Sequence, residues 1–488
     1  MKYIFTYFHH NTLLAFLGLI IGTLVTTAPF VFTNTFENWI HIPGEYAYLI
    51  GFALIVLSFL MYLMYSAFKW LIARFKRFEF SQSYIFLILI FIHIFFAGFR
   101  LDISNLVLII YIFTFSVLLS LRKIERIIVT PIFYFMIVHF LFCNISLLLP
   151  HSIGVTFTYS NLLKLNIKLL VVFLVLNSLM TEKELEHFFR LYIVMCIFTS
   201  LVAVIQAVIF YGTGINYSFA GPNVKRVVVS PIGIYPRVSG FFKHPTVMAT
   251  DISPMFIMML YGFLSPEYIP RRQRTIILSI MGLMLIPLFL STARGTWVAM
   301  FFGCLAIFLL KKPNLLFHKL IALTFLFFIS YVTGLLGFAY DILVSLNEAS
   351  VSSRYGLFEL GLEAIKEYPI LGYGFNNFSS YTGNYTRLSV HSSPFQILSE
   401  TGILGLITYF CLLGYIFWRI LSQLRKTVLG MNRLILEAYF VALITLITNN
   451  FFQQITWATF TFLFLALGDA IARIVKASEE AGRELKLI

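Results

Sequence analysis

Three arginines and one histidine are the side chains in this sequence best suited to chemistry on a phosphate group. Arg237, Arg294 and Arg354 carry planar guanidinium groups, which match phosphate oxygens better than the point charge of lysine does. His391 stands in a polar stretch, and a neutral imidazole there can accept a proton from a hydroxyl near physiological pH. Together they predict a cationic pocket for a diphosphate, with His391 as the base. The alternative is that each arginine anchors a helix at the lipid headgroup layer and that His391 is an ordinary loop residue.

These residues must be positioned by membrane helices. The chain has 488 residues, of which 60% are hydrophobic and only 11% are charged, whereas soluble domains carry about 25% charged residues. This composition excludes a soluble enzyme, a disordered protein and a nucleic-acid-binding protein, despite a formal net charge of +14. Because the apolar runs lack the alternation of membrane strands, we expect an all-α polytopic protein embedded in a lipid bilayer.

Fourteen apolar runs have roughly the 17–25 residues that a transmembrane helix needs, although the ninth, tenth and thirteenth are short. The expected spans lie near 12–32, 46–68, 83–99, 105–121, 127–149, 162–180, 191–211, 247–264, 276–291, 296–310, 320–338, 395–417, 434–449 and 455–472. With both termini in the cytoplasm, 24 of the 35 Lys and Arg residues fall on the cytoplasmic side, as the positive-inside rule requires.

The remaining eleven basic residues lie on the outer side, and eight of them gather in segment 212–246, in the turn around Arg294 and in the loop 339–394. Cations on the translocated side work against insertion preference, so a binding or catalytic use is expected there. We therefore divide the chain into an N-terminal transmembrane bundle, a catalytic half with these outer segments, and C-terminal transmembrane helices with a cytoplasmic tail. The three parts are 1–211, 212–417 and 418–488.

The loop 339–394 is far longer than the others, and loops of this length are commonly functional. Within it the sequence predicts a helix over 354–368, capped by Ser352-Ser353 and ended by Pro369. Apolar residues fall on one side of this helix, which predicts an amphipathic helix at the outer membrane surface. Another side carries a stripe of acids that is either a solvated face or part of a site: Glu359, Glu363 and Glu367.

Secondary candidates lie beside the main ones. Lys243 and His244 precede a span directly and are substrate-binding candidates, whereas Asp251 and Glu400 could order a basic partner or simply lie at the interface. The sequence contains no Walker-type GxxxxGK[ST], no HExxH and no outer-loop DxD pair. An ATPase and a zinc protease are therefore unsupported, and we expect neither a metal nor a cofactor.

Several motifs between residues 230 and 410 occur together. They are PRVSGFFKHPTVMA, LSTARGTWVA, Ser353-Arg354, Pro369 to Gly374 (PILGYG), His391-Ser392-Ser393 and Gln396 to Gly405 (QILSETGILG). This set resembles the signature region of the O-antigen ligase and Wzy-type polysaccharide polymerase superfamily. Two positions depart from that pattern: His391-Ser392 stands where many relatives have His-Asn, and His244-Pro245-Thr246 where many have Asn-Pro-Asn.

The resemblance implies a metal-independent membrane glycosyltransferase that uses an undecaprenyl-diphosphate-linked glycan at the outer face of the bacterial cytoplasmic membrane. Arg237 and Arg294 would then bind the diphosphate and stabilise its leaving charge, as preorganised cations in a partly dry site do well. Arg354 would support this site, and His391 would activate or orient the acceptor hydroxyl. No nucleotide is needed, because the diphosphate is already an activated leaving group. A chain-length regulator is a partner that only the resemblance implies.

The acceptor decides between a polymerase and a ligase. The Phe- and Ile-rich, Ala-poor composition is typical of a low-GC genome, and a host without an outer membrane has no lipid A core to receive glycan. We therefore favour polymerisation of a capsule, exopolysaccharide or teichuronic-type polymer, with an O-antigen ligase as the alternative. A lipid-linked oligosaccharide flippase is the alternative from another class, but it should show two similar halves, and no internal repeat is apparent.

Overall fold

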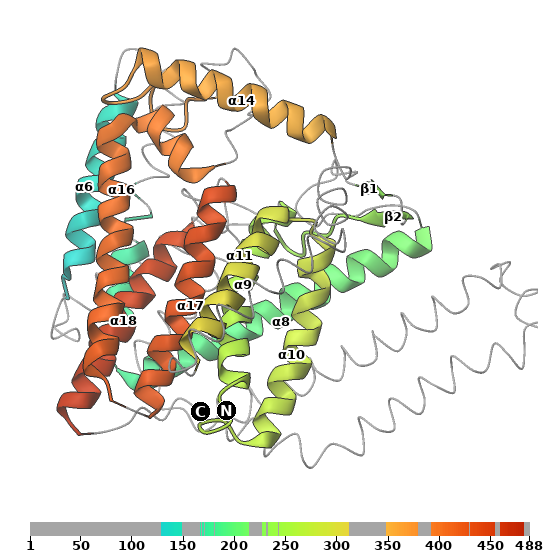
Figure 1. Ribbon diagram of the computed structural model, residues 1–488, viewed down its shortest axis with the longest axis vertical. Helices are drawn as coiled ribbons and strands as arrows, with labels where there is room; N and C mark the ends of the chain where they lie inside the picture. The colour runs from blue at the N-terminus through green and yellow to red at the C-terminus, as the bar shows by residue number, and fades with distance from the viewer. Residues whose placement is uncertain are drawn as a thin grey trace, which may run out of the picture.

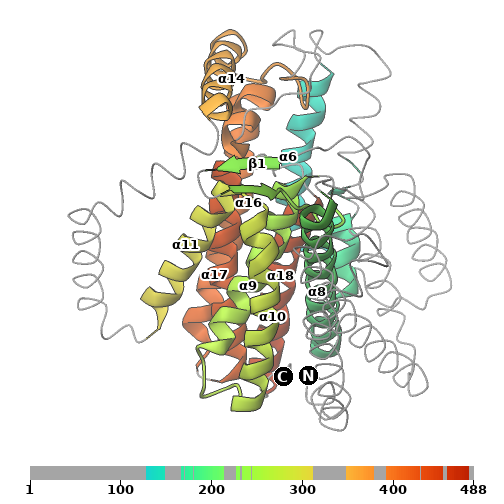
Figure 2. The same cartoon turned by 90° about the vertical axis from the view of Figure 1, so that its right-hand side faces the viewer.

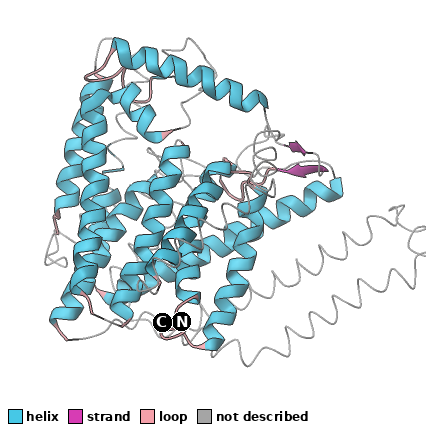
Figure 3. Ribbon diagram, in the orientation of Figure 1, coloured by secondary structure: helices cyan, strands magenta, loops and turns pink. Residues whose placement is uncertain are grey.

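The computed structural model describes residues 128–148, 166, 168–169, 171–179, 181–213, 227–230, 233–242, 244–311, 348–378, 392–428, 430–453 and 459–482. These residues form a bundle of long helices with one short hairpin (Figures 1 and 3). The elements in chain order are α6 (Pro131–Leu147), α8 (Glu182–Thr213), β1 (Val227–Ser230), β2 (Gly233–Pro236), α9 (Pro245–Phe263), α10 (Arg271–Leu290), α11 (Arg294–Leu310), α14 (Glu348–Glu367), α16 (Ser393–Lys426), α17 (Met431–Phe452) and α18 (Thr459–Glu480).

Helices α9 and α17 form the centre of the described bundle. α17 packs against α9, α11, α16 and α18, while α16 also packs against α6, and α10 packs against α8 and α9. In the most apolar stretch of α9 and of α17, 72% of the residues are buried, against 28% in α10 and 33% in α16. α10 and α16 therefore lie at the periphery, where their outward side chains, such as Phe289 and Trp418, suit contact with lipid.

Five of the described helices are long and apolar enough to cross a membrane, namely α8, α9, α10, α16 and α17. α6 and α11 are shorter apolar helices of 17 residues each. The chain is thus a multi-pass membrane protein with a helical bundle. The sequence did not predict the antiparallel hairpin β1–β2, in which Val228 pairs with Tyr235.

The expected spans within the described residues coincide with helices. Those near 127–149, 247–264, 276–291, 296–310, 434–449 and 455–472 correspond to α6, α9, α10, α11, α17 and α18, and residues 171–178 form a helix within 162–180. The spans at 191–211 and 395–417 are parts of the longer helices α8 and α16, whose charged ends extend beyond the apolar run. The spans at 12–32, 46–68, 83–99, 105–121 and 320–338 lie outside the described residues. The total of fourteen spans, the three-part division and the cytoplasmic termini stay predictions.

The two ends of the bundle differ in character. We call the end at which α9, α11 and α16 begin the site end, and the opposite one the basic end. Basic residues gather at the basic end from the start of α10 and α17 and the end of α11 and α16: Arg271, Arg272, Arg274, Lys311, Arg425, Lys426 and Arg433. This is the grouping that the positive-inside prediction requires.

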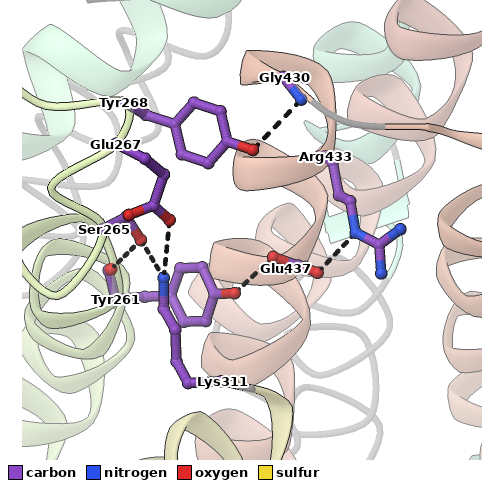
Figure 4. Close-up of polar contacts among 8 residues, drawn as sticks. All are labelled: Tyr261, Ser265, Glu267, Tyr268, Lys311, Gly430, Arg433 and Glu437. Atoms are coloured by element: carbon purple, nitrogen blue, oxygen red, sulfur yellow. Dashed lines mark hydrogen bonds and ion pairs between the residues drawn. The ribbon is translucent and has the colours of Figure 1, made fainter. Parts of the chain in front are cut away.

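A polar network at the basic end joins α9, α11 and α17 (Figure 4). Lys311 donates to Ser265, lies 3.5 Å from Glu267 and sits over the Tyr261 ring, 4.5 Å from its centroid. Tyr261 in turn donates to Glu437, which also pairs with Arg433 at 2.9 Å. The network fixes the register of the three central helices at the end remote from the candidate site.

Candidate active site

The segment that carries Arg237 is held by a buried side chain of α8. Gln206 accepts hydrogen bonds from the backbone nitrogens of Ser239 at 3.1 Å and Gly240 at 2.9 Å, and its amide nitrogen donates to the Gly240 carbonyl at 3.0 Å. Gly240 has φ +56°, and a Cβ there would lie 2.8 Å from Thr199 Cγ2. Only glycine fits this close approach of the backbone to α8, so the segment after β2 has a defined path.

The turn between α10 and α11 is short and strained. Thr292 has φ +51°, an unfavourable backbone for a β-branched residue that costs on the order of 1–3 kcal/mol. The turn is closed by the Arg294 backbone nitrogen, which donates to the Thr292 carbonyl at 3.0 Å. Trp297 stacks on Phe289 at 5.5 Å between ring centroids and donates to the Leu288 carbonyl. These contacts fix Arg294 as the first residue of α11, at the site end.

The structure brings the two upstream arginine segments together. The Arg237 guanidinium donates from Nε to the carbonyl of Ser291, at 2.9 Å. Ser291 is buried and lies three residues before Arg294, and both arginines are partly buried. Two arginine segments that are more than fifty residues apart in the sequence therefore meet at one turn.

The loop motif PILGYG fills a break in α16. Gly402 has φ +65° and ψ −169°, so the helix is interrupted there and backbone groups on both sides of Gly402 lose their helical partners. The segment 369–374 supplies replacements. The nitrogens of Tyr373 and Gly374 donate to the carbonyls of Ser399 and Glu400 at 3.0 and 2.9 Å. In return, the Ile403 nitrogen donates to the Pro369 carbonyl at 2.9 Å, and the Leu404 nitrogen to that of Ile370 at 3.4 Å.

Glu400 ties this segment together from within the break. Its buried carboxylate accepts from the backbone nitrogen of Asn376 at 2.9 Å and from the Gln396 amide at 2.8 Å. Its carbonyl also accepts from the Ser146 hydroxyl of α6, at 2.5 Å. The sequence left Glu400 as either an interfacial acid or the partner of a base. These contacts favour a different role, in which Glu400 orders the backbone that follows segment 369–374.

Helix α14 crosses the site end at a steep angle to the bundle (Figures 1 and 2). Leu357 and Ala364 are buried, and Phe358 stacks on Phe395 of α16 at 4.3 Å between ring centroids. The glutamates of the stripe are exposed, which fits the solvated-face interpretation: Glu359, Glu363 and Glu367. A side-chain hydrogen bond with Glu367 raises the pKa of Tyr368.

The structure has an amphipathic helix in this stretch, but its predicted start is wrong, and its place at the outer membrane surface stays a prediction. α14 begins at Glu348, so Ser352 and Ser353 lie inside it and do not cap it. Inside a helix serine costs at most about 0.7 kcal/mol relative to alanine, so a pair of serines is a weak start signal. The predicted end holds, because the helix stops at Glu367, two residues before Pro369.

The predicted site residues are described to different extents. Arg237 and Arg294 are placed with their side chains, and His244 directly precedes α9 as its N-cap residue, partly buried. Arg354 lies in the first two turns of α14, of which the backbone is described. Lys243 and His391 lie outside the described residues. Ser393, two residues after His391, begins α16 at the site end.

Sequence reasoning missed the side chain that positions the first of these segments. Gln206 sits in an apolar run, where it looks like an isolated polar residue of a span. A buried amide within a membrane helix needs partners, and that requirement was the available signal. Which backbone it would hold could not be read from the sequence, because the partner segment lies over thirty residues away.

Comparison with known proteins adds one finding. A family model described as O-Antigen ligase matches residues 279–410, which include most of α10, all of α11 and α14, segment 369–374 and the first half of α16. Arg237 and Gln206 lie outside this range. No curated protein matches the chain. The match confirms the resemblance drawn from the motifs: residues 279–410 of this membrane protein are similar to the O-antigen ligase family.

Proposed function

We propose that this protein is a glycosyltransferase that polymerises undecaprenyl-diphosphate-linked oligosaccharide repeat units at the outer face of the bacterial cytoplasmic membrane. The observation that carries the proposal is the meeting of Arg237 with the turn before Arg294, through the 2.9 Å bond to Ser291. An arginine bonded to the turn that leads into a second arginine suits a lipid diphosphate, because two guanidinium groups can bind its two phosphates. The family match supports a glycosyltransferase-like enzyme acting on lipid-linked glycans.

The position of Arg294 supports an anionic ligand. It is the first residue of α11, where the partial positive charge of the helix end disfavours a cation by about 0.3–1 kcal/mol. A bound diphosphate would reverse this penalty, because its charge is attracted both by the arginine and by the helix end.

In the proposed reaction, an acceptor hydroxyl attacks the anomeric carbon of the donor sugar. The new bond joins the acceptor oxygen to that carbon, and the bond from the carbon to the diphosphate oxygen breaks. Arg237 and Arg294 stabilise the charge that develops on the leaving undecaprenyl diphosphate. His391 takes the proton of the hydroxyl. Arg354 supports the diphosphate site from α14, and Lys243 and His244 bind substrate beside it. No metal or nucleotide takes part.

The acceptor in this proposal is a second lipid-linked chain, so the product is a longer polymer. The low-GC composition favours this choice, for a capsule, exopolysaccharide or teichuronic-type polymer. Transfer to a different acceptor would make the protein an O-antigen ligase. A chain-length regulator would be a partner of the polymerase.

The test uses purified protein in detergent with lipid-linked repeat units extracted from host cells in which the gene is deleted. A ladder of longer lipid-linked glycans is the expected result, and His391→Ala and Arg294→Ala, purified in folded form, should each abolish it. Transfer to an added acceptor without a ladder would identify a ligase. If the wild-type protein gives neither product, the proposal of a transferase is wrong and a flippase remains.

A further inference from the structure

Gln453 lies where three helices of the site end meet. It follows the last residue of α17 and is 6% exposed. Its side chain contacts Thr250 of α9 and Thr296 of α11, and its backbone carbonyl accepts from the Ser393 hydroxyl of α16 at 2.7 Å. Thr296 is two residues from Arg294, and Ser393 is two residues from His391. One residue therefore links the Arg294 turn to the start of the helix that follows His391.

The hydroxyl of Thr250 settles the direction of the Gln453 amide. This hydroxyl donates its proton to the Thr246 carbonyl at 2.9 Å, so toward Gln453 it acts as an acceptor. The amide nitrogen accordingly faces Thr250 at 3.2 Å and the Thr246 carbonyl at 3.3 Å. The amide oxygen then accepts from the hydroxyl of Thr296 at 2.8 Å and from its backbone nitrogen at 3.2 Å.

This arrangement gives α11 a cap from another helix. Its own N-cap residue, Ala293, has no side chain that can accept a hydrogen bond. The Gln453 oxygen bonds to the backbone nitrogen of Thr296 in the first turn, which also donates to the Ala293 carbonyl at 2.8 Å, so the nitrogen is shared between the two acceptors. The helix that starts with Arg294 is therefore held at its first turn by α17.

Close packing at Gly295 reinforces the same junction. A Cβ on Gly295 would lie 2.7 Å from Phe452 Cβ and 3.1 Å from Gln453 Cγ. The residue after Arg294 thus has to be glycine for α11 to approach the end of α17 this closely. The hydrogen bonds and the packing together hold the first turn of α11 at a defined distance from the end of α17.

We propose that Gln453 is a positioning residue, which holds the Arg294 turn and the start of α16 in the relation that the transfer reaction needs. This inference rests on the proposed function, and it adds a residue from outside the matched range 279–410. The Arg237–Ser291 bond and the Gln206 contacts do not involve Gln453, so the diphosphate site keeps its own supports. We therefore expect Gln453 to affect the alignment of donor and acceptor more than the affinity for the diphosphate.

The test compares Gln453→Leu with Gln423→Leu. Gln423 lies near the basic end of α16 with the same 6% exposure, and its amide bonds to Thr427 of its own helix at 3.4 Å, so it is a matched control. Misplacing reacting groups by about 1 Å lowers rates by about 100-fold. We expect Gln453→Leu to lower kcat for chain extension by about 100-fold, with KM and the affinity for undecaprenyl diphosphate within about twofold of wild type. Gln423→Leu should leave all three unchanged.

Two further variants cover the case in which Gln453→Leu does not fold. Ser393→Ala removes the bond to the Gln453 carbonyl, and Gly295→Ala separates α11 from α17. Both should lower kcat by a larger factor than they weaken undecaprenyl diphosphate binding. Wild-type kcat in the folded variants overturns the positioning role, as does a loss of binding that parallels the loss of rate. A wild-type protein that extends no chain refutes the proposed function itself, and the positioning role with it.

Discussion

Replacing Gly372 with alanine should detach the PILGYG segment from α16. Gly372 has φ +69°, and a Cβ there would overlap the carbonyl group of Glu400 and the nitrogen of Thr401, which are backbone atoms and cannot move aside. The left-handed backbone alone costs alanine about 1–2 kcal/mol. Losing two of the four hydrogen bonds across the break adds about 1–3 kcal/mol at about 0.5–1.5 kcal/mol each. The expected destabilisation of the segment is thus about 2–5 kcal/mol.

Hydrogen exchange measures this effect directly. The amides of Ile403 and Leu404 are protected by the carbonyls of Pro369 and Ile370, so Gly372→Ala should speed their exchange, and thermal unfolding should begin at a lower temperature.

Gly414→Ala is the matched control for this change. Gly414 lies in α16, the helix that segment 369–374 contacts, with no atom within 4 Å of the added Cβ, so alanine there should be neutral or stabilising by about 0.5–1 kcal/mol. Equal exchange at residues 403 and 404 in the two variants would refute the role assigned to segment 369–374.

Two further substitutions test the supports of the site and of the bundle. Gln206→Leu leaves two buried backbone nitrogens without their acceptor, at about 1–3 kcal/mol each, and should weaken undecaprenyl diphosphate binding by loosening the Arg237 segment; unchanged binding would contradict this. Gly303→Ala should destabilise the protein by about 1–3 kcal/mol in denaturant unfolding, because its Cβ would overlap the Thr445 hydroxyl. Gly282→Ala, with open space around it, should not, and equal stability of the two variants would refute the packing argument.

Hydropathy was sufficient to predict most helices of the described part of the chain. An apolar run needs only length to become a lipid-crossing helix, so α9, α10 and α17 lie within a few residues of their expected bounds. Hydropathy could not give the start of α8 at Glu182, because charged residues extend a helix beyond the lipid without adding to its apolar run. The predicted end of α14 was correct, because proline cannot continue a helix.

The break in α16 could not be predicted from its own sequence. The run 395–417 is mostly apolar, with a polar stretch from Ser399 to Thr401, and Gly402 is only one of its glycines. A break in a membrane helix requires a partner for the freed backbone groups, and here the partner is a loop segment about thirty residues away. The motifs PILGYG and QILSETGILG both stood out in the sequence, and the structure explains why they occur together.

The sequence predicted the arginines of the site, but not the side chains that hold their segments in place. An arginine at a tight turn between apolar helices signals function, because a cation there is expensive. Gln206 and Gln453 give a weaker signal: a buried amide needs partners, but a lone glutamine in or near a span fits many roles. Their partners depend on which helices are neighbours, and apolar periodicity does not determine that.

The most direct test of the central claim is a double-mutant cycle on undecaprenyl diphosphate binding to purified protein. If Arg237 and Arg294 share one diphosphate, Arg237→Ala and Arg294→Ala should each weaken binding by about 10- to 100-fold, since a hydrogen bond to a charged group contributes about 1.5–3 kcal/mol. The double variant should lose less than the product of the two effects, because residues that act on one ligand are coupled. Wild-type affinity in either single variant, or two losses that simply multiply, would contradict a shared diphosphate site.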